Sequence, residues 1–172
     1  LAALKNAPEL PEALRPQIEL LDAIVKRLDN DIDFLVWELR PTGLDDLGLA
    51  EALSDYLANW SRYFGLRCRL DARLPGRLPV EGETVLYRIA QEALNNVAKH
   101  ARARQVDVIL ERTGEYALLI VQDDGVGFDA GAPTNPRGLG VLGMRERAAL
   151  MGGSVAIESE ARGTAVRVRI PL

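Results

Sequence analysis

The sequence predicts an α+β protein: a two-layer α/β sandwich with a mixed, mostly antiparallel sheet, preceded by a long N-terminal helix. Three observations predict this class. Apolar residues between positions 17 and 40 recur at helical spacing. Later segments alternate apolar and polar side chains, as half-buried strands do. After the first helix the predicted order is helix, strand, helix, strand, strand, loop, helix, strand, strand, which favours such a sandwich.

The N-terminal region is predicted to be helical. Residues 1–7 have the pattern of a helix end, and three prolines then mark a connector. From residue 17 to 40, apolar side chains are spaced alternately by three and four residues, the heptad pattern of packed helices. We favour a bundle or dimer over a helix folded on its own domain, because this spacing never breaks. The heptad positions are Ile18, Leu21, Val25, Leu28, Ile32, Leu35 and Leu39.

Prolines, glycines and alternating side chains divide the remainder. Pro41 ends the first helix, because proline clashes with a continuing turn, and PTGLDDLGL is predicted as a connector. Gly65 ends the next helix, and Leu66, Cys68 and Leu70 alternate with charged residues as in a strand. The predicted elements are helices at 49–64, 83–100 and 141–151, strands at 66–71, 105–111, 116–122, 154–158 and 165–170, and loops at 72–80 and 123–139.

Composition excludes several classes of protein. The 172 residues are 48% hydrophobic and 27% charged, which is ordinary for a soluble globular domain. The net charge of -4 argues against nucleic acid as the main ligand, because a phosphate backbone needs a basic surface. The longest apolar run, at 117–121, is too short to span a bilayer. One cysteine and one histidine allow neither an internal disulfide nor a usual zinc site.

The first residue bears on localisation. Because the chain starts at Leu1 rather than at methionine, we expect a piece of a longer protein. The lone cysteine fits a reducing compartment, so the piece is expected to be cytoplasmic. The short apolar runs predict no membrane contact by this piece. A membrane anchor elsewhere in the longer protein stays open.

A polar row on the predicted helix at 83–100 is the first candidate site. Glu92, Asn96, Lys99 and His100 follow one another at spacings that share one helix face. An amide oxygen is a suitable ligand for Mg²⁺, and lysine supplies a point charge for phosphate. A solvated helix face with cations near its C-terminus explains the row equally well. The opposite, core-facing set is Leu86, Ile89, Ala93 and Val97.

Three further segments have features of ligand contacts. Asp123 follows a strand within DDGVGF, where a carboxylate accepts a hydrogen bond from an exocyclic amine, although Asp-Gly is also a common turn. GLGVLG at 138–143 opens a helix, whose N–H groups bind anions, and the glycines before it suit a mobile lid. It lacks the βαβ context of a dinucleotide site and the Gly-Lys-Ser/Thr of a Walker A loop. Thr164, at a hairpin turn, is placed to reach a base through water.

Together these four segments, in this order, resemble the catalytic ATP-binding domain of histidine kinases, in the ATPase superfamily shared with gyrase and mismatch-repair proteins. QEALNNVAKHA resembles the family's N box, DDGVGF its G1 box, GLGVLGMRER its G2 box and RGTAVRVRIPL its G3 segment. The segments LYRIAQEALNNVAKHA and GMRERAALMGG are similar in sequence to the nitrate/nitrite-sensor subclass. WELRPTGLDDLGLAEAL resembles that subclass's second dimerisation helix and linker, so the resemblance covers residues 17–172.

The resemblance implies a histidine kinase ATPase fold, ATP and Mg²⁺ as ligands, and a role for each candidate residue. Residues 1–43 would be the remnant of the dimerisation and phosphoacceptor region, and 44–172 the catalytic domain. The implied roles are Mg²⁺ ligation by Asn96, phosphate contacts by Lys99 and His100, adenine binding by Asp123, support of the base by Thr164, a nucleotide lid shaped by Gly125, Gly127, Gly138, Leu139 and Gly140, and a catalytic position at Glu92, where ATPase relatives place a water-activating base.

The resemblance also implies function and partners. The domain would transfer the γ-phosphate of ATP to a histidine, for relay to an aspartate of a response regulator receiver domain, and the full-length protein would be a homodimer through its N-terminal helices. No phosphoacceptor motif is present, and His100 is the only histidine, so the chain itself is not expected to autophosphorylate. The alternatives are an anti-sigma-type serine kinase and an ATP-binding regulatory module on the same fold. The heptad helix and its linker argue against the serine kinase.

Overall fold

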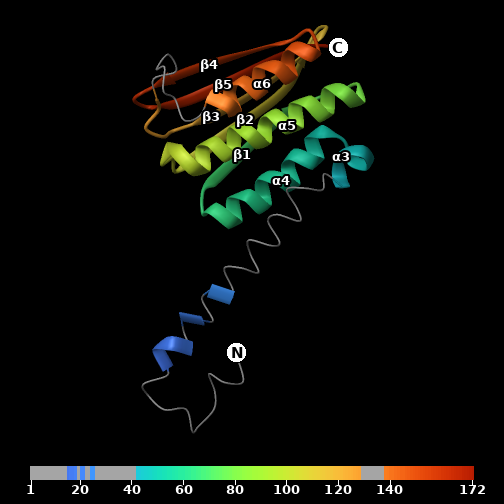
Figure 1. Ribbon diagram of the computed structural model, residues 1–172. Coiled ribbons are helices and arrows are strands. Elements are labelled where there is room, and N and C mark those ends of the chain that lie inside the picture. Colours follow the sequence, from blue (N-terminus) through green and yellow to red (C-terminus); the bar gives the residue numbers. More distant parts are fainter. Residues whose placement is uncertain (1–14, 19, 22–23, 26–41, 129–137) are drawn as a thin grey trace. The chain divides into compact units, whose positions relative to one another are not determined.

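The computed structural model describes residues 15–18, 20–21, 24–25, 42–128 and 138–172 (Figure 1). The chain divides into two compact units, Leu1–Pro41 and Thr42–Leu172. In the first unit the described residues are helical; Ile18 and Val25 are half-buried and Leu21 is exposed. The predicted helix end at 1–7 and the heptad positions Leu28, Ile32, Leu35 and Leu39 lie outside the described residues. Within the described part, no helix has both the length and the apolar character needed to cross a membrane.

The second unit is a five-stranded sheet with helices on one face (Figure 1). The strands are β1 (Arg67–Arg73), β2 (Gln105–Thr113), β3 (Tyr116–Asp123), β4 (Ser154–Glu160) and β5 (Gly163–Pro171). The helices are α3 (Thr42–Leu47), α4 (Leu49–Phe64), α5 (Val80–Asn96), the π-helix η2 (Val97–Ala101) and α6 (Gly138–Leu150). This arrangement confirms the predicted two-layer sandwich.

The sheet is mixed, with strand order β1-β2-β3-β5-β4. β1 and β2 are parallel, because α5 and η2 lie between them in the chain and return it to the same end of the sheet. The other three pairs are antiparallel. The prediction of a mixed, mostly antiparallel sheet is therefore confirmed.

The core lies between the helices and the sheet. Side chains alternate along each strand, so Leu119 and Val121 of β3 are buried under the helices while Gln122 is exposed. α4 packs on β1 and α6 on β4, with α5 between them. The predicted apolar face of α5 and η2 is buried, which confirms that the sequence placed the core side of this helix correctly; its members are Leu86, Ile89, Ala93 and Val97.

Some boundaries differ from the prediction. α4 ends at Gly65 as predicted, with the glycine in the left-handed conformation. The predicted connector PTGLDDLGL is wrong at residues 42–47, which form α3. α5 starts at Val80 rather than at Glu83, and α6 at Gly138 rather than at Val141. The α-helix predicted to reach His100 ends at Asn96 and continues as η2.

An ion pair between exposed Arg77 and buried Glu83 links α3 to α5. Glu83 is 1% exposed and accepts hydrogen bonds from Arg77 Nη2 at 2.7 Å and from the backbone N–H of Leu78 at 3.1 Å. Arg77 also donates to the carbonyl oxygens of Leu44 at 3.0 Å and Asp45 at 3.3 Å. Carbonyls at a helix end lack partners within the helix, so Arg77 supplies a donor to Asp45 and a second donor to Leu44, whose carbonyl oxygen also accepts from the backbone N–H of Gly48 at 3.1 Å.

Replacing Glu83 with alanine is expected to destabilise the domain by about 1–3 kcal/mol, because the buried Leu78 N–H loses its acceptor, whereas the exposed Arg77 can be solvated. Burial raises the pKa of Glu83, but the hydrogen bonds from Arg77 and Leu78 outweigh it and hold the pKa below its ordinary value of 4.5. The stabilisation is therefore complete above that value and is lost as pH falls through the lower, folded-state pKa.

Urea unfolding between neutral and acid pH tests this expectation. Glu81→Ala is the matched control, because Glu81 is exposed in the same helical turn. A Glu83→Ala domain as stable as the Glu81→Ala domain at neutral pH would contradict the structural role of the pair.

Candidate functional site

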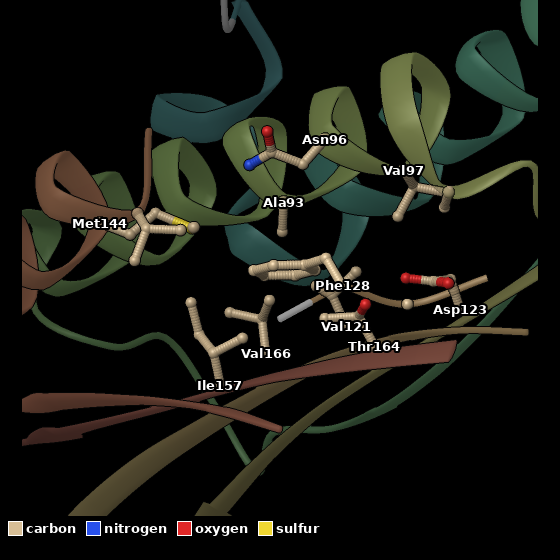
Figure 2. A pocket seen from close by; sticks show the side chains of 13 residues that line it. Ala93, Asn96, Val97, Val121, Asp123, Phe128, Met144, Ile157, Thr164 and Val166 are labelled. Atoms are coloured by element: carbon tan, nitrogen blue, oxygen red, sulfur yellow. The ribbon is translucent and has the colours of Figure 1, made fainter. Parts of the chain in front are cut away.

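A pocket lies between the C-terminal half of α5, the start of α6 and the helix-facing side of the sheet (Figure 2). The cavity itself has a volume of about 30 Å³, and the wider gap between its walls, about 460 Å³, includes open solvent. Apolar side chains form most of its walls, and a few polar groups converge on it. The lining residues that matter below are Asn96, Asp123, Gly127, Phe128, Met144 and Thr164.

Asp123 supplies a buried carboxylate at the end of β3. It follows Leu119 and Val121 on the strand face under the helices, and it is 6% exposed. Its Oδ1 accepts a hydrogen bond from the backbone N–H of Gly125 at 2.8 Å, which fixes the turn that leaves the strand. A buried carboxylate at the rim of an apolar pocket is an acceptor for a ligand N–H group.

The last turn of α5 brings two further predicted residues to the pocket. Asn96 lines it, and Figure 2 shows its amide on the helix above Ala93. Glu92, one turn earlier, contacts the start of α6: a Cβ built on Gly140 would lie 2.1 Å from Glu92 Oε1 and 3.6 Å from Asn96 Nδ2. Glu92, Asn96 and Gly140 are therefore neighbours.

η2 changes the direction of the residues after Asn96. Lys99 is exposed and His100 is half-buried, and neither is among the residues that line the pocket. The prediction of one shared face assumed 3.6 residues per turn as far as His100. That assumption is wrong, because a π-helix has more residues per turn. Their phosphate contacts stay a prediction.

The loop after β3 is fastened to the end of η2. The backbone N–H of Val126 donates to the carbonyl oxygen of Ala101 at 2.8 Å. Asp124 Oδ1 accepts hydrogen bonds from the backbone N–H groups of Arg104 at 2.7 Å and Gln105 at 2.9 Å. The bonds from Gln105 and Arg104 hold the pKa of Asp124 below its usual range. Asp124 is thus a structural residue of the site that sequence reasoning missed.

Gly127 and Phe128 attach the same loop to the β4–β5 hairpin. Gly127 has a φ of 64°, and a Cβ there would lie 1.8 Å from the carbonyl oxygen of Glu160, so only glycine fits. The backbone N–H of Phe128 donates to Ser159 Oγ at 2.8 Å. The Phe128 ring lies between α5 and the sheet (Figure 2).

Thr164 and Ser159 form a hydroxyl pair across β4 and β5. The two residues are cross-strand partners, and their hydroxyl oxygens are 3.0 Å apart. Thr164 was predicted as a site residue, but Ser159 was not. The position of Ser159 in β4 could have indicated that it belongs to the site. Ser159 is on the same strand face as Val155 and Ile157, which are half-buried toward the helices.

The predicted lid is described only at its two ends. Gly125 and Gly127 lie in the loop after β3, and Gly138 and Gly140 lie in the first turn of α6. Residues 129–137 between them and the side chain of Leu139 lie outside the described residues.

The side chains at the pocket could bind a divalent cation only together with other ligands. In the described ranges, no three His, Cys, Asp or Glu side chains gather as a metal cluster. Asn96 offers an amide oxygen at the pocket, and Glu92 has a carboxylate nearby. Mg²⁺ is usually bound by one or two protein groups together with phosphate oxygens and waters, so this set fits Mg²⁺ held jointly with a nucleotide.

Comparison with protein families gives one match to the second unit. The model of the family described as histidine kinase-, DNA gyrase B- and HSP90-like ATPases matches residues 81–172. The matched range includes every residue that lines the pocket.

The chain is also similar to individual histidine kinases. It is 39% identical over 154 residues to the oxygen sensor histidine kinase NreB of Staphylococcus carnosus strain TM300; the match covers 88% of this chain but only 44% of that protein. The histidine kinase domain of the blue-light activated kinase of Erythrobacter litoralis EL346 matches with a TM-score of 0.67 at 20% identity, over 93% of this chain and 82% of that one. Full-length ShkA in complex with AMPPNP matches at a TM-score of 0.60 and 21% identity, over 98% and 40%.

Proposed function

Because this chain belongs to the family of histidine kinase-, DNA gyrase B- and HSP90-like ATPases, we propose that its pocket binds ATP and ADP with Mg²⁺. The single observation that supports this most directly is the buried Asp123 beside Thr164 at the rim of a mostly apolar pocket. An apolar cavity with a few convergent polar groups suits a flat base that needs orientation. The relative ShkA has been solved with AMPPNP, a nucleotide analogue.

Each polar residue has a proposed task. The Asp123 carboxylate accepts a hydrogen bond from the exocyclic amine of adenine, and Thr164 supports the same edge of the base. Asn96, with Glu92 close by, lies where the phosphates would leave the pocket and would hold Mg²⁺. The cation would neutralise charge on the transferred phosphoryl group. The first turn of α6, from Gly138, offers the backbone N–H groups of a helix N-terminus, which suit phosphate.

We propose further that the whole protein is a sensor histidine kinase. The domain would transfer the γ-phosphate to a histidine, and a response regulator receiver domain would take it up on an aspartate. The identity with the sensor kinase NreB supports this, although the chain spans only 44% of that relative's length. Homodimerisation through the N-terminal helices belongs to the same proposal. The serine kinase alternative is less well supported, because the likeness to kinases of the sensor class extends over the N-terminal region.

Asp123→Ala is expected to weaken ADP binding by about 1–3 kcal/mol, because the amine of the base loses its acceptor in a buried site. Isothermal titration calorimetry with ADP and Mg²⁺ measures this directly. Asp55→Ala is a matched control, because Asp55 is exposed on α4 and its substitution removes the same charge. Wild-type affinity in the Asp123→Ala domain would contradict adenine recognition by this residue.

A further inference from the structure

Ser159 connects two parts of the pocket through its hydroxyl. It is half-buried in β4 on the face toward the helices. Its Oγ accepts the hydrogen bond from the Phe128 backbone N–H at 2.8 Å and lies 3.0 Å from Thr164 Oγ1. Thr164 lines the pocket and Ser159 does not, so any effect of Ser159 on a ligand must pass through its neighbours.

The hydrogen bond between the two hydroxyls can run in either direction, because either oxygen can be the donor. A hydroxyl donates one hydrogen bond and accepts two. Ser159 Oγ already accepts a hydrogen bond from the Phe128 N–H. Among the described residues, Thr164 Oγ1 is the acceptor within reach of the Ser159 hydroxyl hydrogen. If Thr164 donated to Ser159, the Ser159 hydrogen would have no acceptor among the described residues, and a ligand could not supply one because Ser159 does not line the pocket. If Ser159 donates to Thr164, the remaining hydrogen is that of Thr164, which lines the pocket and can be donated to a ligand. A bound ligand that offers Thr164 an acceptor therefore satisfies both hydroxyls, and it favours the direction from Ser159 to Thr164.

The acceptor of the pocket lies next to this donor. β3 and β5 pair Gln122 with Ala165, so the next pair in the same register is Asp123 with Thr164. Directly opposite side chains on one sheet face are about 5 Å apart. A Cβ on Gly163 would lie 1.9 Å from the Asp123 carbonyl oxygen, which confirms how closely the two strands approach here. The site thus presents a carboxylate acceptor beside a hydroxyl donor.

We propose that Ser159 is a specificity-determining residue, which fixes the Thr164 hydroxyl as a donor and so makes the pocket select adenine over a 6-oxopurine. The inference rests on the proposed nucleotide function of the pocket. Adenine presents an amino donor beside a ring-nitrogen acceptor, whereas hypoxanthine presents a carbonyl beside a protonated ring nitrogen. Only adenine complements the order of Asp123 and Thr164. The proposed contact of Thr164 with the base is direct, because a bridging water can both donate and accept and would not transmit the direction of the hydroxyl.

The test compares ADP with inosine diphosphate, whose bases differ only at this edge. In Ser159→Ala, the Thr164 hydroxyl is free to turn and accept a hydrogen bond. The ratio of ADP affinity to inosine diphosphate affinity, measured by calorimetry with Mg²⁺, is expected to fall about three- to tenfold, the scale of one hydrogen bond. Some selectivity should remain, because the Asp123 carboxylate still disfavours a carbonyl group.

Two controls separate polarity from a general structural effect. Ser159→Thr keeps the hydroxyl and should restore the wild-type ratio. Ser154→Ala makes the same chemical change at an exposed position of the same strand, and it should leave the ratio unchanged. If Ser159→Ala weakens both nucleotides equally, or leaves the ratio at its wild-type value, the proposal is overturned.

Thr164→Val tests the proposal without altering Ser159. It should lower the ratio by a similar factor, and adding Ser159→Ala should lower it no further, because the two residues act as one unit. Independent, additive losses in the double variant would overturn the inferred relay. A wild-type domain that binds ADP but fails these tests contradicts only the role of Ser159, whereas a wild-type domain that binds neither nucleotide contradicts the proposed function itself.

Discussion

Asn96→Ala is expected to lower phosphoryl transfer from ATP to a histidine acceptor about 100- to 1,000-fold, the usual loss when one group that stabilises transition-state charge is removed. Asn96 ends α5, lines the pocket and lies beside the contact between Glu92 and the start of α6. Its amide oxygen is the protein ligand that we propose for Mg²⁺. Without it the cation loses its link to the protein, and the phosphates lose their alignment.

The assay needs a form of the protein that includes an acceptor histidine. The 172 residues contain one histidine, His100, which lies in η2. Incubation of these residues alone with ATP should therefore yield no acid-labile phosphate, and its appearance would contradict the assignment of the acceptor to another segment. In the form with the acceptor, single-turnover transfer from labelled ATP is compared between wild type and Asn96→Ala.

Binding of ADP separates loss of the cation site from loss of the fold. Mg²⁺ should increase ADP affinity in the wild-type domain and have little effect in Asn96→Ala. Asn95→Ala is the matched control, because it makes the same change one residue earlier on a helix whose Asn96, rather than Asn95, lines the pocket. An equal effect of Mg²⁺ on both variants would remove Asn96 from the cation site.

Helices and strands that depend on signals in their own sequence could be predicted. α4 agrees with its prediction at both ends, because its apolar face is periodic and Gly65 suits the left-handed position that ends it. The two hairpins followed from alternating side chains and turn glycines. α3 was missed because six residues after a proline give no helical signal of their own. Its end is satisfied by Arg77, which donates to Leu44 and Asp45 from more than 30 positions away.

In the site too, residues with local sequence signals could be predicted, and features that depend on distant contacts could not. Asn96, Asp123 and Thr164 belong to segments whose composition points to a ligand, and the structure brings all three to one pocket. The π-turn at η2 could not be predicted, because the Ala101 carbonyl that it positions accepts its bond from Val126, on a loop 25 residues later. The two hydrogen bonds of Ser159 also depend on tertiary contacts, one of them to a residue 31 positions away.

Gly127→Ala is expected to destabilise the domain by about 2–5 kcal/mol, the sum of the cost of a left-handed alanine and of overpacking. The added methyl group would lie 1.8 Å from the Glu160 carbonyl oxygen, which belongs to backbone in β4 and cannot rotate away as a side chain can. If the loop moves instead, the Phe128 N–H leaves Ser159, and the pocket loses the fixed position of its Gly127 wall. ADP binding should be lost in either case.

Gly114→Ala isolates the part of this effect that comes from close contact. Gly114 has nearly the same backbone conformation, with a φ of 62° against 64° for Gly127, but a Cβ there meets nothing within 4 Å. Its substitution should therefore cost only about 1–2 kcal/mol, the left-handed term alone, and leave ADP affinity unchanged. Urea unfolding and calorimetry of the two variants measure both quantities. Equal destabilisation, with nucleotide binding retained in both, would show that the contact between Gly127 and β4 does not hold the loop against the pocket. We expect Gly127→Ala to lose more stability and more ADP affinity than Gly114→Ala. Of the two glycines, only Gly127 has the backbone of β4 directly beside its α-carbon.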